Sequence, residues 1–129
     1  MPTNVDQFNL EVERLSLEVT EKQLPAIVKK ISIDAFNRIV LKTPVDTGRA
    51  RSGWHVSVDA PSEVVFQDIR SPQQVTNEGA EIILGARNFE TIYITNNVNY
   101  IGALEEGTSR QAPLGMVAVT VQEINAALR

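Results

Sequence analysis

The strongest constraint on the fold lies in residues 21–42, where apolar side chains recur every three or four positions. That period places them on one face of an α-helix. The stripe comprises Leu24, Val28, Ile31, Ala35 and Ile39, widened by Ile27, Phe36 and Val40. Pro25 fits only the first turn of such a helix, and Pro44 and Gly48 follow as stop signals. The sequence therefore predicts a long amphipathic helix over residues 21–42.

Two further segments carry helical patterns. Ser71 and Pro72 form a helix start, because a serine hydroxyl accepts from free amides and proline fits the first turn. We expect this helix to end near Gly85. Its predicted core-facing residues are Val75, Ile82, Ile83 and Ala86. A last amphipathic helix is predicted from Leu114, Val117, Ala118, Val121, Ile124 and Leu128.

Strand patterns occupy the middle of the chain. Residues 54–58 alternate apolar and polar side chains, as a strand with one buried face does. Asp59–Ser62 indicates a turn, so we expect Val64–Ile69 to be the returning strand of a hairpin. Residues 91–95 are β-branched and aromatic and predict another strand. Residues 98–106 predict a short helix or turn.

The first 20 residues fit two templates. Phe8, Val12, Leu15 and Val19 lie at helical spacing, but neighbouring residues also alternate as in strands. Glutamate and leucine are good helix formers, which favours the helix and leaves the strand open.

Composition narrows the possible functions. The chain has 129 residues, which predicts a single domain over residues 1–129. It has no cysteine and one histidine, which excludes disulfides, thiolate chemistry and paired-histidine metal sites. We expect no catalytic residue, cofactor or metal. A net charge of −4 argues against a dedicated binder of duplex DNA. No apolar run approaches the length of a membrane-spanning helix, so no membrane association is expected.

One set of residues has the composition of a catalytic triad. His55, Ser57 and Asp59 alternate along the predicted strand. Same-face neighbours on a strand lie roughly 6.6–7 Å apart, whereas a working triad needs hydrogen-bond contact. A solvated strand face opposite Trp54 is the better interpretation. The side chains of Glu105 and Glu106 likewise diverge by about 100° on a helix, which predicts a helix-surface or salt-bridge role.

Two loops are the most informative segments. The first runs from Thr43 to Trp54 and contains Asp46, Gly48, Arg49 and Arg51. Gly48 permits a positive φ, and Asp46 and Thr47 suit a turn stabilised by local side-chain bonds. On an extended chain Arg49 and Arg51 would share a face.

The second loop, residues 107–113, again surrounds one arginine, Arg110. Solvated connections are the simple interpretation of both loops. The functional hypothesis is that they present arginine to carboxylates of a partner protein or to passing phosphates.

These residues carry a family resemblance. The run Thr43–Arg51 (Thr-Pro-Val-Asp-Thr-Gly-Arg-Ala-Arg), with Trp54 behind a long helix, resembles the minor tail and tail-completion proteins of tailed bacteriophages, including relatives of minor tail protein Z. Tyr100–Gly107 and Gln111–Val117 are similar to the family's second motif. The resemblance covers roughly residues 26–124. Asn99 and Glu106 depart from the residues frequent there.

The resemblance implies an α+β fold, with a long helix and a C-terminal helix packed on a small, mainly antiparallel sheet. It implies a non-enzymatic virion protein, assembled in the bacterial host cytoplasm, that forms a homo-oligomeric ring, expected to be a hexamer. The ring would join the tail tube or tail terminator protein to the head connector or adaptor protein. Genomic DNA would pass through its lumen without specific binding. The expected assembly contacts are Asp46, Arg49, Arg51, Trp54, Glu105 and Arg110.

Two alternatives stay open at this point. A nucleic-acid-binding module could use Arg49, Arg51 and Arg110 together with Trp54, although the net charge opposes it. A small hydrolase could use His55. Tight, salt-sensitive binding to free DNA would favour the first of these, and a His55→Ala protein that keeps all biological function would exclude the second.

Overall fold

The computed structural model describes residues 24–88 and 90–128, which form five helices and a two-stranded antiparallel sheet. This confirms the predicted α+β class. In chain order the elements are α2 (Leu24–Lys42), α3 (Arg49–Ser52), β1 (Trp54–Val58), α4 (Pro72–Gly85), β2 (Ile92–Asn96), α5 (Ile101–Glu105) and α6 (Val117–Ala127). The prediction for the first 20 residues lies outside the described part of the chain.

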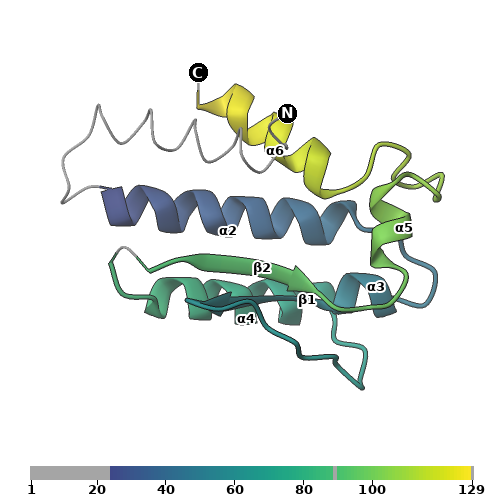
Figure 1. The fold of residues 1–129 in the computed structure, drawn as a ribbon, viewed down its shortest axis with the longest axis horizontal. Coiled ribbons are helices and arrows are strands. Elements are labelled where there is room, and N and C mark those ends of the chain that lie inside the picture. The colour runs from purple at the N-terminus through teal and green to yellow at the C-terminus, as the bar shows by residue number, and fades with distance from the viewer. Residues whose placement is uncertain (1–23, 89, 129) are drawn as a thin grey trace.

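The long helix α2 is the central element. Figure 1 shows it running across the middle, with α6 along one side and α4 and the sheet on the other. It packs against both α4 and α6, while α4 also packs against β1. Pro25 is the second residue of α2, in the first turn as predicted, where its missing N–H removes no helical bond.

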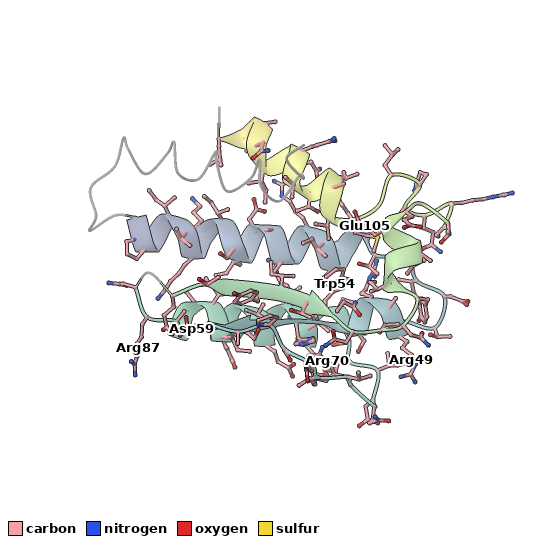
Figure 2. The ribbon with its side chains drawn as sticks, viewed as in Figure 1. Arg49, Trp54, Asp59, Arg70, Arg87 and Glu105 are labelled. Atoms are coloured by element: carbon pink, nitrogen blue, oxygen red, sulfur yellow. The ribbon has the colours of Figure 1, made fainter. Side chains whose placement is uncertain are left out.

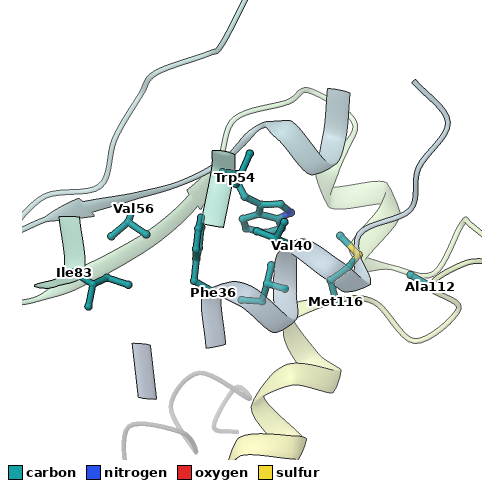
Figure 3. Packing of buried hydrophobic residues seen from close by; sticks show 9 residues of the cluster. Phe36, Val40, Trp54, Val56, Ile83, Ala112 and Met116 are labelled. Atoms are coloured by element: carbon teal, nitrogen blue, oxygen red, sulfur yellow. The ribbon is translucent and has the colours of Figure 1, made fainter. Parts of the chain in front are cut away.

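The core gathers side chains from every layer. Figure 3 shows Phe36 and Val40 of α2 facing Trp54 and Val56 of β1. Ile83 of α4 closes one end of this cluster. Ala112 and Met116, from the connection before α6, close the other. The C-terminal connection is therefore part of the core, not only a surface loop.

The expected hairpin is wrong. β1 pairs with β2 in an antiparallel register that sets Val56 opposite Ile94 and Val58 opposite Ile92. Ile92 and Ile94 pack against the core on the same face as the valines, so this pairing buries apolar side chains from both strands. Val64–Ile69 instead belongs to an irregular connection between β1 and α4, in which Val64, Val65 and Ile69 are exposed.

Helix α4 begins as predicted but buries a different face. The Ser71 hydroxyl accepts a hydrogen bond from the Gln74 amide at 3.1 Å, which confirms the N-cap. Ile83 is buried as expected, whereas Ile82 is exposed because one residue turns a helix by about 100°. The buried stripe consists of Val75, Gly79 and Ile83. A pattern of large apolar residues does not reveal this stripe, because its middle position is a glycine.

Helix α6 begins three residues later than its pattern indicated. Val117 is its first residue, so Leu114 lies in the preceding connection and is exposed. Val121 and Ile124 are buried, as predicted.

Charged side chains connect α2 to α6. Arg38 contacts Asp34 at 2.9 Å on its own helix and Glu123 of α6 at 3.6 Å, and Lys42 also pairs with Glu123. The hydrogen bond that Arg38 donates to Asp34 raises the pKa of Arg38; burial opposes this, and the charges of Asp34 and Glu123 add to it.

The close approach of α4 to α2 gives a matched pair of glycine substitutions. A Cβ at Gly79 would overlap the ring of Phe36, which is fully buried, whereas a Cβ at Gly85 meets nothing. Helix propensity alone favours alanine at both positions. We expect Gly79→Ala to lower the free energy of unfolding by about 1–3 kcal/mol through overpacking. Gly85→Ala should leave it unchanged or slightly raised, and urea unfolding measures both. Equal stabilisation by the two substitutions would contradict this packing.

Candidate functional site

The two loops singled out in the sequence lie side by side at one end of the molecule, shown at the right of Figure 1. We call this region, residues 43–51 and 100–116, the arginine-loop end. Gln111 joins its two halves: its side-chain oxygen accepts from the Val45 amide at 2.9 Å, and its side-chain nitrogen donates to the Val45 carbonyl at 3.1 Å. The Gln111 side-chain amide thus forms the same pair of hydrogen bonds to the Val45 backbone that a residue of a neighbouring β-strand would form.

The first loop is anchored from beneath by Thr43. Its hydroxyl donates to the Ile39 carbonyl and accepts from the Trp54 indole, both at 2.7 Å. Trp54 is only 5% exposed. Its expected role as an assembly contact is therefore wrong, because the ring fills the core and its one polar atom is bonded inside.

The turn itself has the predicted chemistry. Gly48 has φ +89°, a conformation that residues with a Cβ adopt at a cost. The Thr47 hydroxyl accepts from the Arg49 amide at 3.3 Å. These contacts define the start of α3.

Arg49 and Arg51 do not share a face. They lie on the short helix α3, where a separation of two residues turns the side chains by about 200°. Arg51 donates through Nη2 to the carbonyls of Leu41 and Thr43, at 2.9 and 3.2 Å. These carbonyls lie at or just beyond the C-terminus of α2, where cations are favourable. Arg51 is thus engaged in the fold, whereas Arg49 is exposed.

Glu105 has a role that sequence reasoning missed. One of its carboxylate oxygens accepts from the amides of Met116 and Val117, at 2.9 and 2.8 Å. The other accepts from the Ala118 amide at 3.1 Å. A carboxylate at a helix N-terminus satisfies free N–H groups and complements the helix dipole. The predicted surface or salt-bridge role of Glu105 is replaced by a remote N-cap of α6.

Two glycines make room for this cap. Gly115 has φ +84°, and a Cβ there would overlap the Glu105 carbonyl and carboxylate. Gly107 has φ +92°, and a Cβ there would overlap the Pro113 carbonyl. The second loop is therefore closely packed at both ends. Its Gly-to-Pro pattern signalled a loop, but not which carboxylate would hold it.

Three of the expected contact residues remain available at the surface. Asp46 and Arg49 on the first loop and Arg110 on the second are exposed. Between the loops lies a groove of about 320 Å³, lined by residues 44–50 together with Tyr100, Leu104, Ser109 and Gln111. The arrangement offers both charges and hydrogen-bond donors to a partner surface.

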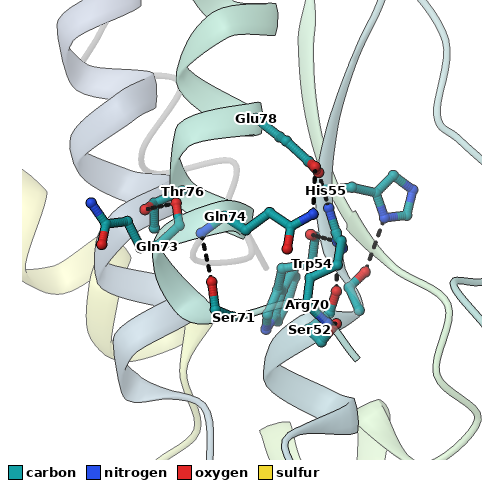
Figure 4. A network of polar contacts seen from close by, with 10 residues as sticks. Ser52, Trp54, His55, Arg70, Ser71, Gln73, Gln74, Thr76 and Glu78 are labelled. Atoms are coloured by element: carbon teal, nitrogen blue, oxygen red, sulfur yellow. Dashed lines mark hydrogen bonds and ion pairs between the residues drawn. The ribbon is translucent and has the colours of Figure 1, made fainter. Parts of the chain in front are cut away.

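A buried arginine absent from the sequence predictions fixes the neighbouring connection. Arg70 donates through Nη2 to the carbonyls of Ser52 and Trp54, at 2.5 and 2.9 Å, and forms an ion pair with Glu78 (Figure 4). Its guanidinium lies 3.6 Å from the centre of the Phe66 ring, a cation–π contact. No pattern in the sequence distinguishes this arginine from the exposed ones.

The triad-like residues do not converge. The His55 Nδ1 lies 2.9 Å from the Gly53 carbonyl, and the Ser57 hydroxyl donates to the Ala60 carbonyl at 2.7 Å. His55 is buried beneath Phe66, so the expected solvated face is wrong at this position. Within residues 24–88 and 90–128, no group of three metal-ligating acidic or histidine side chains comes together.

The chain matches no protein-family model, no curated protein and no solved structure. None of the helices described here is both long and apolar enough to cross a membrane.

The cap of α6 gives a second matched pair. Glu105→Gln keeps the size of the side chain but removes its charge and one acceptor oxygen, so it should lower the free energy of unfolding by about 1–2 kcal/mol. Glu106→Gln, the exposed neighbour, should change it by less than about 0.5 kcal/mol. Thermal or urea unfolding separates the two. A Glu105→Gln protein as stable as wild type would rule out the cap as a stabilising contact.

Proposed function

We propose that this protein is a structural component of a tailed-bacteriophage virion, assembled as a homo-oligomeric ring at the head-proximal end of the tail. In this role it completes the tail, joins it to the head and lines a passage for DNA. We infer six copies, with the tail tube or terminator protein on one side and the head connector or adaptor on the other. The proposal includes assembly in the host cytoplasm and incorporation into the virion.

The observation that carries the proposal is the arginine-loop end. Gln111 fixes two loops together, and these loops leave Asp46, Arg49 and Arg110 exposed on one rigid end. A pre-ordered surface loses little conformational entropy when a partner binds. The same loops contain the residues that resemble the tail-completion family.

The size of the chain supports several copies acting together. A folded chain of 129 residues has a radius of gyration of about 14 Å, too small to surround a DNA duplex alone. A net charge of −4 suits a channel along which DNA moves without adhering, because affinity for DNA rises steeply with each phosphate neutralised.

The structure weakens the nucleic-acid alternative. Of its four expected contacts, Trp54 is in the core and Arg51 is bonded to α2 carbonyls. Arg49 and Arg110 remain exposed. Two exposed arginines on an acidic protein provide little positive charge for a dedicated nucleic-acid-binding surface.

Charge reversal at the free arginines tests the proposal. Arg49→Glu with Arg110→Glu should leave the melting temperature close to that of wild type, because both side chains are exposed. It should abolish ring formation, or joining to isolated tail tubes, as followed by native mass measurement and negative-stain microscopy. Arg51 is unsuitable for this test, since its loss also removes bonds within the fold.

Arg87→Glu is the matched control. Arg87 is an exposed arginine at the opposite end of the molecule, and Figure 2 shows the two ends. The control should assemble as wild type does. If the double variant also forms normal rings and joins tail tubes, the arginine-loop end is not the assembly surface. A wild-type protein that stays monomeric even with tail tubes would overturn the proposed function.

A further inference from the structure

Beside the arginine-loop end lies a second groove with a distinct chemistry, of about 320 Å³. We call it the Leu41–Leu114 groove, after two leucines of its lining, which are 63% and 75% exposed. It is formed where the end of α2 meets the connection that leads into α6. Its lining is Leu41, Lys42, Thr43, Arg51, residues 111–115 and Val119.

The groove combines apolar side chains with positively charged ones. Its lining includes Lys42 and Arg51 and contains no carboxylate. Arg51 donates its hydrogen bonds to neutral carbonyl oxygens, and among the residues that the structure describes it forms no ion pair with a carboxylate. Lys42 also pairs with Glu123. Such a surface favours a segment that combines branched apolar side chains with a carboxylate.

The chain itself exposes a segment of that kind. Residues 59–69, which we call the acidic loop, carry Asp59, Glu63 and Asp68, all exposed. Next to Glu63 stand Val64 and Val65, which are 51% and 55% exposed. Exposed apolar residues grouped in this way, and rimmed by charge, mark interaction surfaces.

The acidic loop is held in a defined position. The Asn97 side chain donates to the carbonyls of Ser62 and Val64, at 2.9 and 3.0 Å. Arg70 fixes the far end of the loop against β1. Docking of this segment would therefore require little ordering of the loop.

The two surfaces face different parts of space. Figure 1 shows the acidic loop below the sheet, whereas the connection that leads into α6 lies on the other side of the end of α2. The Leu41–Leu114 groove is lined by that connection and by the end of α2. One copy therefore cannot bring its own loop into its own groove. A contact between two different patches of identical chains is heterologous, and such contacts close rings when the rotation between copies allows it.

We propose that Glu63–Val65 of one copy docks into the Leu41–Leu114 groove of the next copy. The valines cover Leu41 and Leu114, and Glu63 lies toward Lys42 and Arg51. A second copy is the occupant because both halves of the contact, apolar and oppositely charged, are present on this one chain. The inference rests on the proposed function, for which it supplies the contact between neighbouring copies.

The absence of cysteine allows a direct test by disulfide trapping. Val64→Cys and Leu114→Cys proteins are prepared separately, mixed at a concentration at which wild type is assembled, and treated with a mild oxidant. The mixture should give a heterodimer on a non-reducing gel. Leu84→Cys replaces either partner as the control, because Leu84 is 62% exposed on α4 and belongs to neither surface. The yield of cross-linked heterodimer should be at least about tenfold higher than in either control mixture, because docking holds the two thiols at high effective concentration.

The double variant extends the test. A chain with both Val64→Cys and Leu114→Cys should form a ladder of covalent oligomers that ends at the ring's copy number. Yields equal to the control mixtures, in a sample where wild type forms rings, would overturn the docking contact and leave the proposed function standing. A wild type that never assembles, and mixtures that never cross-link above the controls, would overturn both.

Discussion

The carboxylate of Glu105 is the contact on which the arrangement of the arginine-loop end depends. It reaches across from α5 and accepts hydrogen bonds from three backbone amides at the start of α6. This one side chain sets the direction of the last helix and the path of the loop before it. Gly107 and Gly115 are shaped to permit that path. Met116, next to the cap, is fully buried in the core, so the cap also fixes core packing.

The arginines fall into two groups, those that bond within the fold and those that are exposed. Arg51 and Arg70 bond to backbone carbonyls and hold α2, β1 and the acidic loop in place. Arg49 and Arg110 are exposed on the two loops of the arginine-loop end. Only some of the arginines are therefore free at the surface, and substitution of an arginine tests assembly only where the side chain is free.

Periodicity predicted the regular elements well, because each helix and strand repeats its own burial pattern. The predicted ranges 21–42 and 71–85 contain α2 and α4, and the predicted strand over residues 91–95 covers all of β2 except its last residue, Asn96. Strand pairing was not predictable in the same way. Val64–Ile69 and Ile92–Asn96 both have strand-like sequences, and only packing against α2 and α4 favours the second.

The candidate site was predicted in location but not in detail. Gly48, Pro44 and the Gly107–Pro113 segment marked rigid loops, since glycine and proline constrain the backbone locally. The roles of Glu105, Gln111 and Arg70 arise from contacts between distant parts of the chain. A side chain that forms a hydrogen bond to a backbone group far along the sequence leaves no periodic pattern in that sequence. The sequence also does not distinguish a buried arginine from an exposed one.

We infer that the arginine-loop end is ordered before any partner binds. Amide hydrogen exchange of the isolated protein tests it most directly. The amides of Val45, Met116, Val117 and Ala118, each bonded to a side chain, should exchange with opening free energies close to those of the core amides of α4. Exchange of these four amides as fast as that of the exposed loop residues Glu63 and Gln67 would contradict a preformed surface.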